Sequence, residues 1–288
     1  MAYKDTMFRS LFNNKTSLLE LYNALCGTNH REGDAEITIN TLNETLVSRR
    51  KNDISFTLDG RLVVMLEHQS SVNENLPFRF LQSISRIFEN GIPNKKTIYR
   101  KRLLKFPRPE FIALINAPGR FPDRKVMRLS DSFMDVPGFN EIKLELEVMV
   151  YNINEGQNPE ILARCAVLKE YAYFVARARW HIEAEKRRRR TAFEAEVIRV
   201  AMRKAVQDCK AQGYLMDYWK SMSEEDMSVF EGDWDQDLAL EVSREEGWEE
   251  GREEGREEGR EKYREDLLAL IEQGYTMEDL KRELSARA

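Results

Sequence analysis

The chain has 288 residues, of which 42% are hydrophobic and 33% are charged, and its formal net charge is −5. This composition suits a globular protein, and the length suggests one full domain with an appendage, or two domains. No apolar run approaches the ~18 residues that a membrane-spanning helix needs, so we expect no membrane partner.

The N-terminus and the cysteines indicate the cellular compartment. The chain begins Met1-Ala2-Tyr3-Lys4-Asp5 and has no hydrophobic signal segment. Its cysteines are few, odd in number and widely spaced: Cys26, Cys165 and Cys209. This pattern argues against a disulfide framework and against a CxxC-type zinc site. We therefore expect reduced core thiols in a cytoplasmic protein.

The first half of the chain predicts alternating helices and strands. Apolar residues at helical spacing predict a helix over 16–26, with a Ser or Thr as its N-cap and Gly27 as its stop. A short alternating strand is predicted over 37–41. Two longer strands, over 53–58 and 61–69, flank Asp59-Gly60, which is the strongest short hairpin signal.

A second helix and two more strands complete this half. The helix begins at Pro77 and ends before Gly91. The strands are predicted over 110–116 and 143–152. Because helices and strands alternate, we predict one α/β domain over residues 1–155, with a mixed sheet flanked by helices.

The second half of the chain is predicted to be helical at first and then becomes strongly acidic and repetitive. Apolar-periodic patterns over 160–180 and 183–212 predict a helical extension that covers residues 156–222. Residues 223–288 form an acidic tail with a repeated Gly-Arg-Glu-Glu unit. Ion pairs within the repeat barely offset its glycines, so this part is a frayed helix or a flexible tether. A small helical hairpin is predicted over 264–284.

Two carboxylates and an amide are predicted to converge at one end of the hairpin. Successive side chains of a strand alternate faces, so Glu67 and Gln69 point the same way while His68 points the opposite way. Counting back from the tight turn brings the Asp53 end of one strand beside the Glu67 end of the other. Hard oxygen ligands of this kind suit Mg²⁺ or Mn²⁺. Gln69 could orient an attacking water, although a neutral amide cannot supply the positive charge of a lysine.

The spacing alone leaves a second interpretation open. Most polar residues at strand ends are simply solvated, and this explains Asp53 and Glu67 equally well. The preceding run, Leu62 to Leu66, is fully apolar, as expected of a buried central strand. A buried strand that ends in Glu-His-Gln favours a functional site. His68 is expected to be a packed histidine rather than a metal ligand.

An ordered series of short motifs covers nearly the whole chain. The series is Lys4-Asp5 with Phe8-Arg9 and Leu11-Phe12, LLELYNAL (Leu18–Leu25), NDISF (Asn52–Phe56), LEHQSS (Leu66–Ser71), PFRFL (Pro77–Leu81), NINEGQN (Asn152–Asn158) and the Gly-Arg-Glu-Glu tail. Together these motifs resemble the Rpn family of recombination-promoting nucleases and transposase-like proteins. This family belongs to the PD-(D/E)XK nuclease superfamily.

The resemblance implies a restriction-endonuclease-like fold and a set of catalytic residues. In that pattern Asp53 matches the first motif acid, Glu67 the second, and Gln69 the position usually held by lysine. Such sites bind Mg²⁺ or Mn²⁺ as cofactor. An acid on the first helix often completes the metal site, and the candidates for it are Glu20 and then Asp5.

A basic segment with no acidic residue follows the second predicted helix. It contains Lys95, Lys96, Arg100, Lys101, Arg102, Lys105 and Arg108. The functional interpretation is contact with DNA phosphates beside the active site, and the alternative is a solvated loop. Arg79 and Arg86, on the preceding helix, could reach the DNA backbone or form surface salt bridges. A second cluster, Arg177, Arg179 and 186–190, is diluted by glutamates.

These observations predict a metal-dependent DNA endonuclease that hydrolyses phosphodiester bonds. By resemblance, its setting is bacterial DNA recombination or mobile-element activity. The leading alternative is a catalytically degenerate nuclease fold that binds nucleic acid or a protein, and a third is a scaffold that assembles through its tail. Two staggered cuts would favour a homodimer, but no sequence feature identifies an interface.

Overall fold

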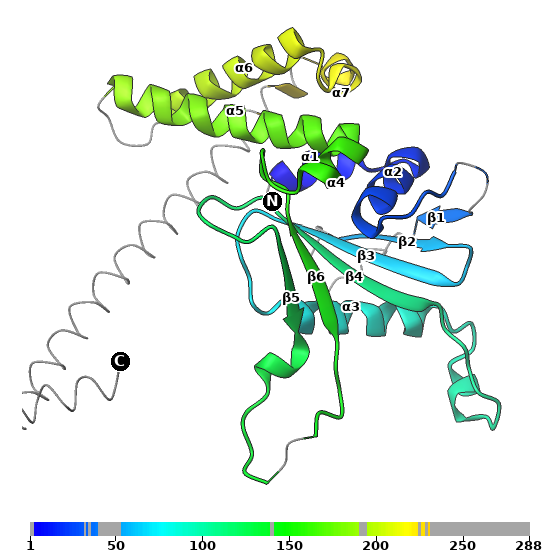
Figure 1. Ribbon diagram of the computed structural model, residues 1–288. Coiled ribbons are helices and arrows are strands. Elements are labelled where there is room, and N and C mark those ends of the chain that lie inside the picture. Colours follow the sequence, from blue (N-terminus) through cyan, green and yellow to red (C-terminus); the bar gives the residue numbers. More distant parts are fainter. Residues whose placement is uncertain are drawn as a thin grey trace, which may run out of the picture. The chain divides into compact units, whose positions relative to one another are not determined.

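The computed structural model describes residues 3–31, 33, 36–39, 53–138, 141–189, 195–223, 226, 227 and 230. The chain divides into two compact units, Met1–Asp237 and Leu238–Ala288, and the described residues all lie in the first (Figure 1). The predicted Gly-Arg-Glu-Glu tail and the predicted helical hairpin over 264–284 lie outside the described residues. Among the helices in the described part of the chain, none combines the length and apolar character that a bilayer crossing demands.

A six-stranded mixed sheet forms the framework of the first unit. In spatial order its strands are β1 (Ile37–Ile39), β2 (Asp53–Leu58), β3 (Leu62–Gln69), β4 (Arg108–Ile115), β6 (Glu147–Asn152) and β5 (Arg124–Arg128). The three central strands β3, β4 and β6 are parallel, and the outer strands pair antiparallel with their neighbours. The predicted mixed α/β sheet is therefore confirmed.

The β2–β3 hairpin turns at Asp59 and Gly60, as predicted. Both residues have positive φ angles, 52° and 61°. Pairing starts at Leu58 opposite Leu62 and continues to Asp53 opposite Glu67. The loop therefore has three residues, because Arg61 belongs to it together with Asp59 and Gly60. A two-residue turn would have placed Leu66 opposite Asp53, so the extra residue shifts the register by one and brings Asp53 opposite Glu67.

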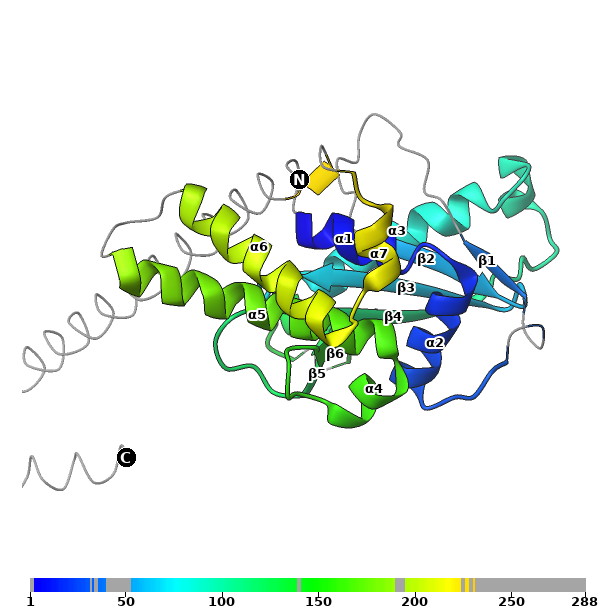
Figure 2. The same ribbon diagram turned by 90° about the horizontal axis from the view of Figure 1, so that it is seen from above.

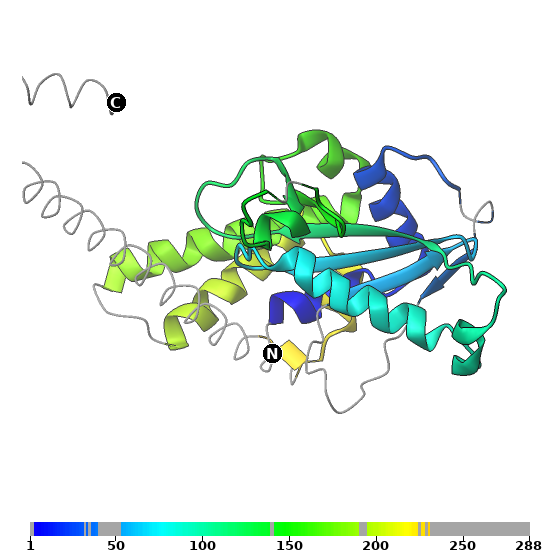
Figure 3. The ribbon, with the colours of Figure 1, turned by 90° about the horizontal axis from the view of Figure 1, so that it is seen from below.

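Helix α3 (Leu76–Asn90) connects β3 to β4 and covers one face of the sheet (Figure 3). It carries the chain back to the far end of the sheet, as a parallel connection requires. Phe80 and Ile84 of α3 pack in the same buried cluster as Val63 and Met65 of β3. Odd-numbered residues of β3 therefore face α3. Burial of a side chain such as Phe80 stabilises the fold by about 1.5–3 kcal/mol.

The remaining helices gather on the opposite face (Figure 2). They are α1 (Tyr3–Leu11), α2 (Lys15–Cys26), α4 (Pro159–Arg164), α5 (Ala166–Arg189), α6 (Ala195–Gln212) and α7 (Met216–Ser221). Two short 3₁₀ turns, η1 (Lys95–Tyr99) and η2 (Leu129–Ser132), lie in loops. The ring of Phe8 on α1 stacks on His68 of β3, and Tyr22 on α2 meets Phe56 of β2 edge-on. Even-numbered residues of β2 and β3 therefore face this helical layer.

The helical extension belongs to the same compact unit as the predicted nuclease core. Its helix α5 buries Tyr171, whose ring meets both Phe8 and His68. The predicted break between 180 and 183 is wrong, because α5 continues without interruption to Arg189. Buried residues continue through that region, including Ala178 and Ile182. One apolar stripe therefore holds a single helix against its neighbours.

Three other details differ from the sequence predictions. The cap of α2 is Asn14, whose side chain accepts a hydrogen bond from a backbone N–H in the first turn. Strand β5 was not predicted, because in this edge strand only Met127 is buried and the apolar signal is weak. All three cysteines are free, but only Cys165 and Cys209 are buried, whereas Cys26 is exposed.

The pair of helices α5 and α6 contains a buried carboxylate that makes stability depend on pH. Glu185 on α5 forms ion pairs with Lys204 on α6 and with Arg188. The hydrogen bond from Lys204, reinforced by Arg188, lowers the pKa of Glu185 below its usual range. A carboxyl group whose pKa is lower in the folded state stabilises the fold above its unfolded pKa. That contribution is lost as the pH falls through the folded pKa.

We therefore expect Glu185→Gln to be less stable than the wild type at neutral pH, and the difference to disappear in acid. Urea denaturation between about pH 7 and pH 3 measures this, because the unfolded pKa of Glu lies near 4.3. Glu196→Gln, at an exposed position of the neighbouring helix α6, is the control and should change stability little. A difference that stays constant down to about pH 3 would contradict the ion-pair explanation.

Candidate active site

The candidate site begins at the carboxyl end of β3, which is buried between β2 and β4. Leu62 to Leu66 are apolar, and the following three residues are buried as well: Glu67 is 1% exposed, His68 1% and Gln69 8%. Buried polar groups need partners, because an unpaired buried donor, acceptor or charge is costly. The polar residues at the end of β3 are therefore buried inside the protein, unlike those of a solvated strand end.

The hairpin register places Asp53 directly opposite Glu67. The prediction that the Asp53 end of the hairpin lies beside the Glu67 end is confirmed, but counting from a two-residue Asp59-Gly60 turn would pair Asp53 with Leu66. The pairing differs by one residue because Arg61 is also part of the loop. The side chain of Asp53 is not among those that the structure describes. On its other side Glu67 pairs with Ala113 of β4, and Ala113 belongs to the core cluster under α3.

Glu67, Gln69 and Arg79 form one hydrogen-bonded cluster on the α3 face of the sheet. The Gln69 amide donates to Glu67 Oε2 at 3.0 Å. Arg79 Nη2 contacts the same carboxylate oxygen at 3.0 Å, and Arg79 Nη1 donates to Gln69 Oε1 at 3.2 Å. The guanidinium group therefore binds both β3 side chains at once, which holds the carboxylate and the amide in fixed orientations.

The start of α3 brings Arg79 to this position. Pro77 lies in the first turn of α3, and the backbone N–H of Arg79 donates to the Asn75 carbonyl. Arg79 therefore lies on the turn of the helix that is nearest to the end of β3. The sequence left two interpretations of Arg79 open, a DNA-backbone contact and a surface salt bridge, and it did not predict the buried contact with Glu67. Arg79 places a positive charge beside the neutral Gln69.

His68 points to the opposite face of β3, as the alternation predicts. Its Nε2 atom lies 3.2 Å from the Tyr171 hydroxyl, and its ring stacks on Phe8 with centroids 4.7 Å apart. It is 1% exposed. The prediction of a packed, hydrogen-bonded histidine is confirmed.

The structure does not place Glu20 with Asp53 and Glu67. Glu20 Oε1 accepts a hydrogen bond from the backbone N–H of Ala166, at the start of α5. Its helix α2 packs on the face of the sheet opposite to α3, as Tyr22 against Phe56 shows. Periodicity placed Glu20 on a helix but could not say which face of the sheet that helix covers. The side chain of Asp5, the second candidate, is outside the described residues.

The basic segment is not beside Glu67 either. Arg108 pairs with Leu62 at the start of β3, and Glu67 lies five strand positions further on, roughly 17 Å away at about 3.3 Å per residue. The remainder of the segment, with Lys95, Lys96, Arg100, Lys101, Arg102 and Lys105, precedes Arg108 at that far end (Figure 1). The reason is the course of α3, which returns the chain to the start of the parallel strands before β4 begins.

The donor set at the end of β3 has the chemistry that a divalent cation requires. Mg²⁺ is commonly bound through one or two carboxylates, with waters and phosphate oxygens as the other ligands. Asp53 and Glu67 occupy paired positions, so their number and type fit such an ion. Among the residues whose side chains are described, no group of three His, Cys, Asp or Glu residues could hold a metal.

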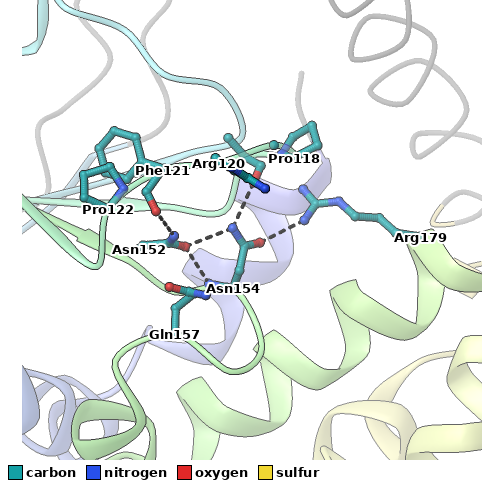
Figure 4. Close-up of a pocket in the computed structure, with 10 residues that line it drawn as sticks. Pro118, Arg120, Phe121, Pro122, Asn152, Asn154, Gln157 and Arg179 are labelled. Carbon is teal, nitrogen blue, oxygen red and sulfur yellow. Dashed lines mark hydrogen bonds between the residues drawn. The ribbon is translucent and has the colours of Figure 1, made fainter.

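An open pocket of about 610 Å³ lies at the carboxyl ends of β4 and β6 (Figure 4). We call it the strand-end pocket, and its lining residues are Ala117, Pro118, Gly119, Arg120, Phe121, Pro122, Asn152, Asn154, Gln157 and Arg179. No sequence pattern predicted this pocket. The available signal was the NINEGQN motif, which supplies three of the polar lining residues.

The NINEGQN motif builds the wall of this pocket. Asn152 donates to the Phe121 carbonyl at 2.9 Å and accepts from Asn154. Asn154 donates to the Ala117 carbonyl at 2.9 Å and accepts from Arg179 at 2.9 Å. The network joins the β4–β5 loop, the segment after β6 and helix α5. The side chains of Asn152, Asn154 and Arg179 therefore hold the wall of the pocket in place through these hydrogen bonds.

No protein-family model, no curated protein and no solved structure matches the chain.

Proposed function

We propose that the protein is a metal-dependent DNA endonuclease with a restriction-endonuclease-like core. The observation that carries the proposal is the pairing of Asp53 with Glu67 at the buried end of β3, where Glu67 is also bound by Gln69 and Arg79. The motif resemblance to recombination-promoting nucleases supports DNA as the substrate. It also supports DNA recombination or mobile-element activity as the setting.

In this proposal Asp53 and Glu67 would hold a Mg²⁺ or Mn²⁺ ion. When bound, such an ion stabilises charge on phosphoryl oxygens and lowers the pKa of an attacking water. Glu67 is oriented for this role by its two hydrogen-bond donors, Gln69 and Arg79. A ligand that is fixed by neighbouring hydrogen bonds binds without further reorganisation.

Arg79 has a second role in this proposal. Its side chain is 16% exposed, whereas that of Glu67 is 1% exposed. Arg79 is thus the more accessible member of the pair. A guanidinium group can bind a carboxylate and a phosphate through different N–H groups. Arg79 would supply the positive charge near the scissile phosphate that lysine supplies at the Gln69 position of related sites.

One observation favours the alternative of a non-catalytic binding module. The Glu67 carboxylate already forms a buried ion pair with Arg79. A carboxylate with a purely structural role would form the same kind of pair. In that case the sheet end would hold α3 in place, and the protein would bind nucleic acid or a partner protein without cutting.

Cleavage of supercoiled plasmid separates the two functions. The wild type, Asp53→Ala and Glu67→Gln are compared with Mg²⁺, with Mn²⁺ and with EDTA. The matched control is Glu74→Gln, which removes an exposed carboxylate shortly before α3. We expect the wild type and the control to cut with metal, and each active-site substitution to reduce cutting by about a hundred-fold or more.

Three outcomes would decide against this assignment in different ways. Cutting that survives both substitutions would show that another site, or a contaminant, is responsible. Cutting that persists in EDTA would contradict the metal requirement. DNA binding without cutting, by a folded wild type under all metal conditions, would establish the binding module instead.

A further inference from the structure

The strand-end pocket lies at the same edge of the sheet as the candidate active site. Gln69, Ile115 and Asn152 are in register at the carboxyl ends of β3, β4 and β6. Neighbouring strands are about 4.8 Å apart, so the Gln69 and Asn152 backbones are roughly 10 Å apart. Val150, two residues before Asn152, belongs to the core cluster under α3. Asn152 and Gln69 therefore lie on the same face.

Two polar side chains that line the pocket take no part in the hydrogen-bond network of its wall. Arg120 is exposed and Gln157 is half-buried. Within the described part of the chain, neither side chain forms a hydrogen bond or an ion pair with another residue. A guanidinium group suits a phosphate, because its donors match two phosphate oxygens. A carboxamide presents a donor and an acceptor side by side, as a nucleobase edge does.

The pocket also offers flat apolar surface. Pro118, Phe121 and Pro122 line it together with the polar groups. Phe121 is only partly buried, and it packs against the core cluster. An aromatic ring that is held in this way can stack with a base. The volume of about 610 Å³ is within the ~300–1,000 Å³ typical of small-ligand sites.

We propose that the strand-end pocket binds one unpaired nucleotide of single-stranded DNA. Arg120 contacts its phosphate, Gln157 its base edge, and Phe121 its base face. The inference rests on the proposed function for the choice of DNA as ligand. A nucleotide held here would keep the neighbouring phosphodiester within reach of Glu67 and Arg79. The preferred substrate would then be single-stranded DNA or the unpaired part of a duplex.

Fluorescence anisotropy with a short labelled oligothymidylate tests this proposal. The full-length protein is measured in EDTA so that binding is separated from cutting. We expect Arg120→Ala to weaken binding about ten-fold and to lower the slope of log affinity against log salt by about 0.7. Gln157→Ala should weaken binding about three-fold and reduce the difference between thymidine and adenosine homopolymers. The wild type should bind an abasic oligonucleotide more weakly than it binds the intact oligothymidylate.

The matched controls are Arg128→Ala, in the exposed Arg128–Glu147 pair at the other end of β5, and Gln207→Ala, on the exposed face of α6. Both should bind like the wild type. If Arg120→Ala and Gln157→Ala also bind like the wild type, the pocket is not the nucleotide site. Equal losses on double-stranded and single-stranded DNA would overturn the preference for an unpaired nucleotide.

A mononucleotide separates failure of the pocket from failure of the nuclease. Thymidine monophosphate should raise the melting temperature of the wild type but not that of Arg120→Ala/Gln157→Ala. Stabilisation of this kind without plasmid cleavage would support the pocket and contradict the nuclease. Plasmid cleavage together with unchanged nucleotide and oligonucleotide binding in the double variant would contradict the pocket alone.

Discussion

Replacing Arg79 with alanine is expected to lower the free energy of unfolding by about 3–5 kcal/mol. The substitution leaves the Glu67 carboxylate, which is 1% exposed, without the guanidinium group that contacts it at 3.0 Å. It also removes the donor to Gln69 Oε1. A buried charge that loses its partner cannot recover the hydration it gave up on folding.

Urea denaturation of single and double variants tests this prediction. Arg79→Ala/Glu67→Gln should recover much of the lost stability, because the second change removes the charge that Arg79 balanced. The matched control is Arg86→Ala, since Arg86 is an exposed arginine on the same helix. That control should alter stability by no more than about 0.5 kcal/mol.

The same variants report on the metal without any activity measurement. If Asp53 and Glu67 bind a divalent ion, millimolar MgCl₂ should restore part of the stability of Arg79→Ala, because a ligand stabilises the state that binds it. It should restore none in Arg79→Ala/Glu67→Gln. An Arg79→Ala variant as stable as the wild type without metal would show that the pair does not hold the Glu67 charge.

The second large effect is expected at Phe8. Its replacement by alanine should lower the free energy of unfolding by about 3–5 kcal/mol. Phe8 is 0% exposed, stacks on His68 with ring centroids 4.7 Å apart and meets Tyr171 edge-on at 5.5 Å. Its ring therefore joins α1, β3 and α5. Removing it leaves a cavity between three elements that are far apart in sequence, so the site cannot easily collapse.

Thermal or chemical unfolding measures this cost, and Phe78→Ala provides the comparison. Phe78 is a phenylalanine of α3 that is 51% exposed, so its loss removes little buried surface and should change stability far less. Equal effects of the two substitutions would contradict the assignment of Phe8 to the core between β3 and α5.

The sequence was most informative where a local rule decides the structure. The Asp59-Gly60 turn marks where the hairpin reverses, so the Asp53 end lies beside the Glu67 end. Alternation along β3 likewise decides that His68 faces away from its two neighbours. Both inferences need only nearby residues, and both agree with the structure.

The sequence was least informative about partners that come from distant segments. Glu20 was placed on a helix correctly, but its helix covers the other face of the sheet. The basic segment was placed near the active site because it follows α3 in sequence. In space α3 carries it to the opposite end of the parallel strands, since a parallel connection must return to the starting edge.

By itself, the sequence determined the mixed α/β class, the place of the hairpin turn and the face of His68, because strand alternation and turn chemistry act over a few residues. The exact register, which puts Asp53 opposite Glu67, came from the structure, because Arg61 joins the loop. Only the tertiary structure decided that Arg79 binds Glu67 and Gln69, and that the NINEGQN motif and Arg179 build a pocket beside them. Those contacts depend on which face each helix covers and how its side chains pack. These are properties of the whole fold that no short stretch of sequence encodes.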